Sequence, residues 1–499
     1  MRTIRIAGFA LAALTVASAP AMAAGPGTLF GPYPGEMTVY ETPDTTLVTI
    51  GNWQLRKEIP KLPQLRLTME HVLHVTEYPT GIPTYTYVVS NSVWHRYLEP
   101  SPEIISEFVP TRFANYVIAN GAVISRVGLF HEHVHLFLYT QAPGAYPLWF
   151  DEGLANLVAQ GLFTGDKVRI YPPEPPGHWI STERVLRATK SSPDYLSGQD
   201  SHSFHLQSQV MVHRALIEDP EFGKSVGRYL DALNNLQSVE EATQSGFNLS
   251  LDALNDQMLG YADRSWKLYA SLGIGIAPKE RMPAGRELPP VEALWGIATV
   301  ALDTGLHLDR VGELIDAAEK LGPQNPRTHL LRMRLAARQQ DDAELERLYL
   351  EIQPRLTDAE VARGAGLASF ERTLYLQEQP ANAPLRQRML ARSFELLDRS
   401  LNARPDDPEA VWAFAMAAAG TRQGLATALK RLEPTFAKVP RNPDLAIAAA
   451  LVYEAAGRYE EMLPCLNAAS VFSHTYEQKR WAAGKIAEAK EKLAAAKAP

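Results

Sequence analysis

The chain has 499 residues, a formal net charge of −7, 46% hydrophobic residues and 21% charged residues. Its length exceeds what one ordinary hydrophobic core supports, so we expect two or more domains in a folded, globular protein. The acidic balance, with no run of lysine or arginine, argues against a nucleic-acid partner or an anionic-membrane partner. The single cysteine, Cys465, excludes an intramolecular disulfide bond.

Residues 1–23 have the three-part pattern of a secretory signal peptide. Arg2 and Arg5 precede an apolar run, and small residues at Ala21 and Ala23 predict cleavage near Ala23. The apolar run is shorter than the ~20 residues that a membrane-spanning helix needs. We therefore expect an exported protein, periplasmic or secreted, with no stable membrane span in the mature chain.

Residues 24–276 are predicted to form an α+β domain. Its first stretch, GPGTLFGPYPGEMTVYETPD, is rich in turn residues and is expected to be irregular. Alternating β-branched segments predict strands, and apolar spacing of three and four residues predicts helices. The predicted strands are TTLVTI, TYTYVVS and FANYVIAN, and the predicted helices are residues 53–75, the NSVWHRYL segment and most of residues 183–269.

Residues 277–290, APKERMPAGRELPP, have the composition of a linker, and residues 291–499 have nearly continuous helical patterning. Pro-x-x-Pro segments end at Pro326, Pro408 and Pro443, and the last two are separated by close to the ~34-residue period of a helix-turn-helix repeat. We predict an all-α TPR-like helical repeat domain that offers a surface for a protein partner. An irregular α-helical domain is the alternative.

The segment HEHVH contains the pattern His-Glu-x-x-His within an apolar, uninterrupted helical stretch. Positions four apart lie on one face of a helix, so His131 and His135 can bind the same metal ion. Glu132 lies beside that face, where its carboxylate can accept a proton from metal-bound water. His133 points to roughly the opposite side and is expected to pack or hydrogen-bond elsewhere.

A second predicted helix, PLWFDEGLANL, follows the turn-forming segment QAPGAYP and carries Glu152. An antiparallel helix is a common way to bring a third ligand to a histidine pair, and two histidines with one glutamate form a known catalytic Zn²⁺ set. Asn156 lies on the same face as Glu152, where its side-chain oxygen can accept the free ring N–H of His131. The alternative makes Glu152 an exposed carboxylate at a helix start.

The pair HEHVH and WFDEGLA resembles the gluzincin metallopeptidases, and most closely the bacterial peptidase MA-like family. The resemblance implies a zincin-like catalytic domain with His131, His135 and Glu152 as zinc ligands and Glu132 as general base and acid. It also implies hydrolysis of a peptide or protein substrate. The whole chain is then an α+β zincin-like catalytic domain followed by an all-α TPR-like helical repeat domain.

Two further features follow from this resemblance. The strand FANYVIAN would be the edge strand that borders the cleft. The segment FHLQSQVMVHRAL is similar to a helix of the family, but His205 stands where the family has a tyrosine that steadies the oxyanion. An imidazole N–H can donate to a developing oxyanion, so His205 is the expected donor, with Tyr116 as the less favoured candidate.

Other functions fit the sequence less well. A serine triad lacks the G-x-S-x-G segment, whereas glycosidase carboxylates need not be close together in the chain. The main alternative is a non-catalytic exported scaffold, in which the TPR-like half binds a partner and the zinc site is degenerate or structural. The intact Glu132 argues against that alternative, because a structural site needs no base, and the missing tyrosine argues for it.

Overall fold

The computed structural model of the chain describes residues 36–42, 45–50, 54–75, 81–142, 144–196, 198–263, 270–275, 283–376 and 379–497. The predicted signal peptide, residues 1–23, lies outside these ranges. Within them, no helix is both long enough and apolar enough to cross a membrane.

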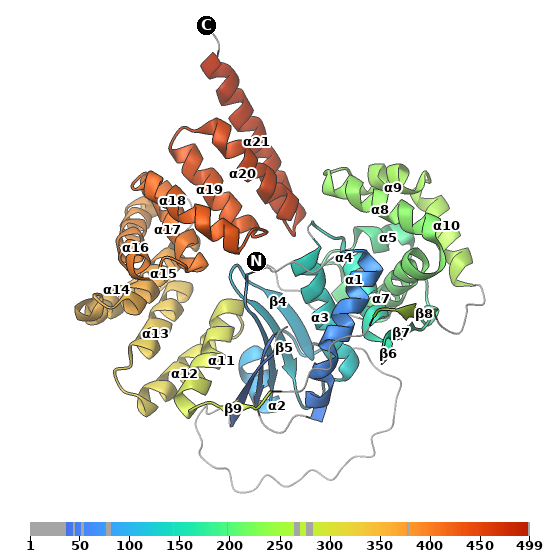
Figure 1. Cartoon of the computed structure of the whole chain (residues 1–499), viewed down its shortest axis with the longest axis horizontal. Coiled ribbons are helices and arrows are strands. Elements are labelled where there is room, and N and C mark those ends of the chain that lie inside the picture. Colours follow the sequence, from blue (N-terminus) through green and yellow to red (C-terminus); the bar gives the residue numbers. More distant parts are fainter. Residues whose placement is uncertain are drawn as a thin grey trace.

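A six-stranded mixed sheet lies at the centre of the molecule (Figure 1), with the strand order β4-β5-β3-β2-β1-β9. Strands β2, β3 and β5 run parallel to one another, whereas β4, β1 and β9 pair antiparallel to their neighbours. The strands are β1 Met37–Glu41, β2 Thr46–Ile50, β3 Thr84–Val89, β4 Ser106–Pro110, β5 Asn115–Asn120 and β9 Arg286–Glu287. The three predicted strands are therefore confirmed as β2, β3 and β5.

Two sequence-based expectations about this sheet are wrong. The segment expected to be irregular contributes β1, whose residues Val39 and Tyr40 are buried. The strand FANYVIAN, which is β5, is not the edge strand, because β4 pairs along its outer side from Pro110↔Asn115 to Ser106↔Ala119. The segment SEFVP is only five residues long, and it carries too little periodicity to stand out in the sequence.

The two faces of the sheet bury alternate residues of each strand against different helices. One face packs on the helices α1 (Leu62–Leu73) and α3 (Arg126–Gln141), and the 3₁₀ helix η1 (Gln54–Lys61) leads into α1. The other face packs on the short α2 (Asn91–Val93), the π-helical turn η2 (Trp94–Leu98) and helices from beyond residue 290. Thus Val117 of β5 faces α3, and Ile118 faces the opposite layer.

A helical lobe covers the far side of α3 (Figure 1, right). Its central helices α4 (Leu148–Ala159) and α7 (Gly198–His213) pack closely against each other, and α4 also packs on α3. A three-stranded antiparallel sheet that the sequence analysis did not predict lies at its margin. The remaining elements are β6 Leu162–Thr164, β7 Lys167–Ile170, α5 Thr182–Arg187, α6 Pro193–Leu196, η3 Arg214–Glu218, α8 Pro220–Asn234, α9 Val239–Phe247, α10 Leu251–Ala262 and β8 Ala270–Gly273.

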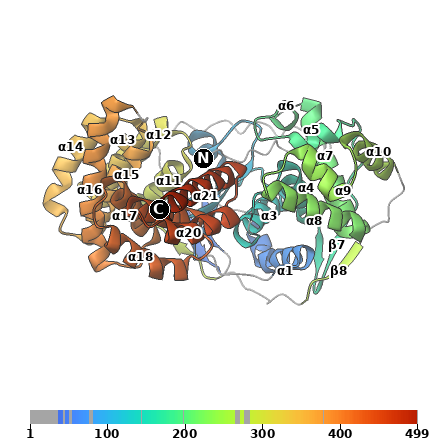
Figure 2. The same ribbon diagram turned by 90° about the horizontal axis from the view of Figure 1, so that it is seen from above.

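Beyond residue 290 the described chain is helical, as predicted, and each helix packs mainly on the next one or two (Figures 1 and 2). Pro326, Pro408 and Pro443 are the first residues of helices, where proline's missing N–H costs no helical hydrogen bond. The helices are α11 Pro290–Thr304, α12 Leu308–Leu321, α13 Pro326–Gln339, α14 Asp342–Ile352, η4 Gln353–Arg355, α15 Ala359–Leu374, η5 Pro380–Asn382, α16 Ala383–Ala403, α17 Pro408–Thr421, α18 Leu425–Lys438, α19 Pro443–Ala455, α20 Tyr459–Phe472 and α21 Tyr476–Lys497.

The helical half and the N-terminal half share one core. Helices α11 and α12 pack directly on the sheet, where Ile297 and Leu314 join the same buried cluster as Ile118. Strand β9 lies in the segment predicted to be a linker, and it pairs with β1 through Arg286 and Val39. The two halves are therefore joined by buried side chains and by a strand pairing.

Gly153 permits the close packing of α4 on α7 that places Glu152. A Cβ atom at Gly153 would lie 2.3 Å from the Ser208 carbonyl oxygen. We expect Gly153→Ala to destabilise the fold by about 1–3 kcal/mol, because the two helices must move apart. Calorimetric thermal unfolding measures this loss.

The matched control is Gly227→Ala in α8, where an added Cβ meets no atom within 4 Å. Alanine is the better helix former by about 1 kcal/mol, so this variant should be as stable as the parent or more so. Equal unfolding temperatures for the two variants would contradict the close approach of α4 and α7.

Candidate metal centre

Helix α3 begins at a capped turn and runs through the middle of the N-terminal half. Its N-cap, Ser125, accepts a hydrogen bond from the Gly128 N–H at 3.1 Å, which satisfies one of the free donors at the helix start. All ten residues from Leu129 to Leu138 are buried, so the polar side chains of HEHVH lie inside the protein. Such groups are costly to bury without partners, so the partners of each one explain the site.

His131, His135 and Glu152 come together at one point in the interior. Each offers one ligand atom, and these atoms all lie within 4.8 Å of one another. The two histidine Nε2 atoms are 2.9 Å apart, and Glu152 Oε2 lies 3.3 Å from that of His131 and 3.8 Å from that of His135. The structure thus brings the three predicted ligands together.

Glu152 is fully buried in the first turn and a half of α4. Its Oε1 accepts a hydrogen bond from the Tyr195 hydroxyl at 2.9 Å, whereas its Oε2 accepts none with normal geometry from the residues that the structure describes. Burial alone would raise the pKa of Glu152, but the neighbouring histidines His131, His135 and His205 lower it. A buried carboxylate oxygen that faces two imidazole nitrogens is the arrangement that a bound cation satisfies.

The outer nitrogen of His135 has an anionic partner. His135 Nδ1–H donates to Asp151 Oδ1 at 2.6 Å, which directs Nε2 into the site. Burial opposes the charged imidazole, yet the Asp151 carboxylate raises the pKa of His135 to about 9. A carboxylate behind a ligating histidine both fixes the ring tautomer and increases the basicity of the ligand.

Glu132 is fixed against the edge of the sheet by both of its oxygens. Oε1 accepts from the Ser106 hydroxyl at 2.8 Å, and Oε2 accepts from the Phe108 N–H at 2.8 Å. Burial raises the pKa of Glu132, although His131 and His135 act in the opposite direction. A carboxylate offers about four acceptor positions, so these two bonds orient Glu132 and leave capacity for a water molecule.

His205 and Asn156 lie next to Glu152, and they contact each other. Asn156 Nδ2 donates to His205 Nδ1 at 3.4 Å, and that nitrogen lies 3.7 Å from Glu152 Oε2. The structure does not bring Asn156 to His131, so the predicted acceptor role of Asn156 has no counterpart here. Burial lowers the pKa of His205 to about 4, which keeps the ring neutral with its proton on Nε2.

The remaining predicted residues lie elsewhere. Tyr116 is not at the site, because its hydroxyl donates to Asp303 of α11 at 2.5 Å on the opposite face of the sheet. His133 points away from the ligands, as predicted: its Nδ1–H donates to the Leu129 carbonyl oxygen at 2.9 Å, and its Nε2 lies 3.2 Å from Thr86 Oγ1. Burial lowers the pKa of His133 to about 4.

Sequence reasoning missed several residues that orient the ligands. Asp151 directly precedes Glu152 in the sequence. A second carboxylate beside a predicted metal ligand is a candidate hydrogen-bond acceptor for one of the ligating histidines. Tyr195 and Ser106 come from a one-turn helix and a short strand, and neither segment carries a local signal. Lys190, which the sequence pattern does not single out, lies near Asp151, and burial lowers the pKa of its ammonium group to about 8.

Comparisons with solved structures find TPR-like helical proteins. No family model matches the chain, and no curated protein matches it. Among solved structures, the chain is similar to a thermophilic TPR protein, TTC0263 of Thermus thermophilus, with 14% identity over 40% of this chain and 99% of that one, at a TM-score of 0.31. It is also similar to yeast Tom70, with 11% identity over 73% of each chain, at a TM-score of 0.31.

The contact between Asp151 and His135 is open to a direct test. For the zinc site that the sequence predicts, we expect Asp151→Ala to weaken metal binding by roughly 10–100-fold, because His135 loses the acceptor that directs its Nε2 into the site. Competition with a chromogenic chelator measures the affinity. Asp252→Ala, which removes an exposed carboxylate from α10, makes the same change in charge and should leave the affinity unchanged. Equal affinities of the two variants would show that Asp151 does not support a metal ligand.

Proposed function

We propose that this protein is an exported zinc-dependent metallopeptidase that hydrolyses peptide bonds of a peptide or protein substrate. The observation that carries the proposal is the convergence of three buried ligand atoms, from His131, His135 and Glu152, within 4.8 Å of one another. Beside them lies Glu132, a carboxylate held in place by the edge of the sheet. The proposal includes a zincin-like assignment for residues 24–276 and export through the signal peptide.

The ligand set favours zinc over the other common divalent ions. Two imidazoles and one carboxylate are donors that suit Zn²⁺ and leave one position open for chemistry, whereas Mg²⁺ and Ca²⁺ prefer oxygen ligands. The orphaned Glu152 Oε2 and the tautomer of His135, set by Asp151, both fit a cation at this point. When bound, zinc would lower the pKa of a water molecule toward ~7 and polarise a substrate carbonyl.

Glu132 is the proposed general base and acid. Its two hydrogen bonds to β4 hold the carboxylate beside the ligands, so little reorganisation is needed to accept a proton from water. Burial raises the pKa of Glu132 toward neutral pH, so the side chain can also return the proton to the leaving amine. Both roles belong to one side chain.

His205 is the proposed donor to the oxyanion. Its neutral ring keeps one proton on Nε2, because Asn156 Nδ2 donates to Nδ1. A buried N–H of this kind gains more from a developing negative charge than it would in water. Tyr116 is not part of this proposal, since its hydroxyl bonds to Asp303 on the opposite face of the sheet.

The outer edge of β4, rather than that of β5, is the proposed guide for an extended substrate. The Phe108 N–H points away from β5 and bonds to Glu132, so this edge of the sheet meets the ligand cluster. A peptide that adds to the edge would exchange main-chain hydrogen bonds with β4 and bring its carbonyls past Glu132.

A non-catalytic scaffold is the second candidate, and the extent of the helical array favours it. Helices α11 to α21 make up most of the chain beyond residue 290, and arrays of this kind commonly bind protein partners. In that case the metal site would be structural, and Glu132 would serve only to join α3 to β4.

The substitution Glu132→Gln separates the two candidates. We expect hydrolysis of a quenched fluorescent peptide library to fall by about 10²–10⁴-fold, because glutamine cannot take up the proton. Zinc content should stay near one ion per chain, since no ligand is lost. The control Glu103→Gln changes an exposed carboxylate in the same way and should keep full activity. A zinc-loaded parent with no hydrolysis of any library member would favour the scaffold.

The ligand role of Glu152 is tested by metal content. Glu152→Ala should lose zinc during dialysis, because two imidazoles alone bind the ion more weakly than three protein ligands. Elemental analysis of untagged, purified protein measures the loss beside the parent. Retention of one zinc per chain by this variant would place the metal elsewhere.

A further inference from the structure

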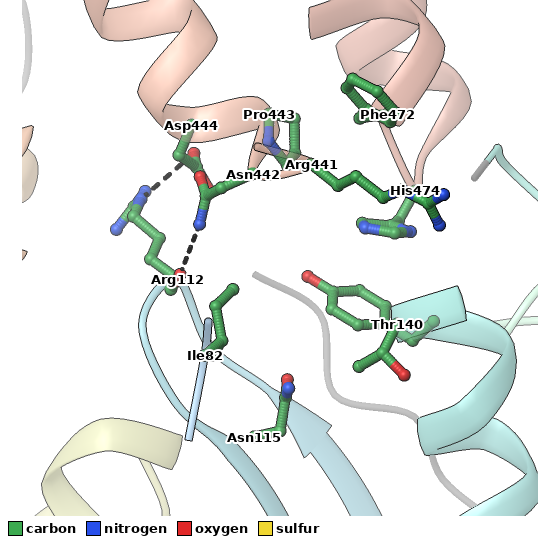
Figure 3. A pocket seen from close by; sticks show the side chains of 11 residues that line it. Ile82, Arg112, Asn115, Thr140, Arg441, Asn442, Pro443, Asp444, Phe472 and His474 are labelled. Atoms are coloured by element: carbon green, nitrogen blue, oxygen red, sulfur yellow. Dashed lines mark hydrogen bonds and ion pairs between the residues drawn. The ribbon is translucent and has the colours of Figure 1, made fainter. Parts of the chain in front are cut away.

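A small cavity lies where the helical half meets the end of α3 (Figure 3). Asn115, Tyr139 and Thr140 line it from the N-terminal half, and Arg441 and Asp444 line it from the helical half. Its volume is about 30 Å³. Because one water molecule needs roughly 10–15 Å³ by the same measure, the cavity has room for a small end group rather than for a large side chain.

The side chain of Asn115 points into this cavity without a partner (Figure 3). Asn115 is 0% exposed, and neither its Nδ2 nor its Oδ1 makes a hydrogen bond within the described structure. An amide buried in this way costs free energy unless a ligand or water supplies both an acceptor and a donor. The cavity therefore contains a buried amide whose donor and acceptor both lack hydrogen-bond partners among the described residues.

The charge around the cavity favours an anion. Among the described residues that line it, two are arginines, Arg112 and Arg441, and one is a carboxylate, Asp444, whose Oδ1 lies 3.3 Å from Arg112 Nε. His474 adds no charge near neutral pH, because burial lowers its pKa to about 4. The cavity also lies at the positive N-terminal end of α19, a helix of 13 residues. The lining side chains and the helix end together make the potential positive.

The cavity lies close to the ligand cluster along two elements. On α3, Tyr139 comes four residues after His135, which is one helical turn or about 6 Å. On the sheet, Asn115 pairs with Pro110, and Pro110 comes two residues after Phe108, about 7 Å along β4. Phe108 N–H bonds to Glu132, so a peptide on the outer edge of β4 would extend from the catalytic carboxylate toward the cavity.

We propose that this junction cavity binds a carboxylate of the peptide substrate, an inference that rests on the proposed peptidase function. The acid group accepts from Asn115 Nδ2, the arginines of the cavity wall supply attractive positive charge, and a main-chain N–H of the same peptide donates to Asn115 Oδ1. Charge-assisted bonds of this kind are about twice as strong as neutral ones. A peptide parallel to β4 presents its terminal carboxylate here, and an antiparallel one presents an acidic side chain.

This assignment gives the helical half a part in substrate recognition. Arg441 belongs to the turn between α18 and α19, and its Nη1 donates to the Gln141 carbonyl oxygen at 3.1 Å at the end of α3. Asn442 Nδ2 donates to the Arg112 carbonyl oxygen at 2.9 Å (Figure 3). Residues of both halves line the cavity and these contacts lie beside it, so the proposed specificity site is shared between the two halves.

The test measures peptide binding without hydrolysis. The full chain carrying Glu132→Gln, both zinc-loaded and chelator-treated, is titrated calorimetrically with N-acetyl-tetraalanine and with its C-terminal amide. A second pair of blocked tetrapeptide amides, acetyl-Ala-Ala-Glu-Ala and acetyl-Ala-Ala-Gln-Ala, separates the side-chain source of the carboxylate. We expect the acid member of one pair to bind about tenfold more tightly than its neutral partner, the gain that charge-assisted bonds in a buried site supply.

Asn115→Leu is the decisive variant. Leucine has a similar shape and removes an unsatisfied amide, so thermal unfolding should be unchanged or occur at a higher temperature. The preference for the acid should fall to about one, because this variant removes the amide donor, and Arg441→Gln should reduce the preference, because it removes a positive charge from the cavity wall. Arg332→Gln, which removes an arginine paired with Asp316 on α12, makes the same change in charge away from the cavity and should keep the preference.

The outcomes separate the two proposals. Two results would overturn the carboxylate site and leave a cavity that holds water. One is equal binding of acid and neutral peptides by the Glu132→Gln protein, and the other is a preference for the acid that survives the addition of Asn115→Leu. A preference that is lost in Asn115→Leu while the parent lacks hydrolysis would support the cavity and reject the peptidase. A preference for the terminal acid would also identify the enzyme as one that acts near the C-terminus of its substrates.

Discussion

The carboxylate of Glu152 is the charge that the N-terminal half must accommodate. It is fully buried, and an isolated carboxylate in such a place would be strongly destabilising. His131, His135 and His205 surround it with imidazole nitrogens, and Tyr195 donates to the oxygen that faces away from them. Each of these residues has its own packing requirement, so the positions of α3, α4, α6 and α7 are coupled through one side chain.

The close contact of α4 with α7 is part of the same constraint. Gly153 directly follows Glu152, and its lack of a Cβ lets the α4 backbone approach the Ser208 carbonyl. That approach sets the depth of Glu152 below α3. On the other side of α3, the sheet edge holds Glu132 through Ser106 and Phe108, so the two glutamates are positioned by different layers of the fold. The proposed roles of Glu152 as a metal ligand and of Glu132 as a general base call for such separate environments, because the pKa values of the two carboxylates must differ.

The helical half contributes more than an adjacent surface. Helices α11 and α12 complete the core on one face of the sheet, and the turn before α19 contacts the end of α3. The stacked rings of Tyr139 and His474, 3.7 Å apart between centroids, add an aromatic contact at this junction. A displacement of the helical array would therefore disturb these contacts at the end of α3, the helix that carries His131 and His135.

The sequence by itself determined the elements whose signals are local. The i, i+4 spacing of His131 and His135 places both on one helical face wherever that helix lies, and the turn before α4 makes Glu152 available to them. The parallel strands β2, β3 and β5 were also predictable, because their β-branched patterning is a local property. The helical half was evident from its periodicity and from proline at helix starts.

Only the tertiary structure decided which residues surround these elements. Tyr195 reaches Glu152 across 43 residues, and Arg441 reaches Gln141 across 300, distances over which sequence patterns carry no information about contact. The edge position of β4 depends on which strand pairs last, and Asn156 turned to His205 because the α4–α7 packing placed that ring nearer. Helix and strand formation follow local backbone preferences, whereas edges, buried partners and the junction cavity depend on how whole layers pack.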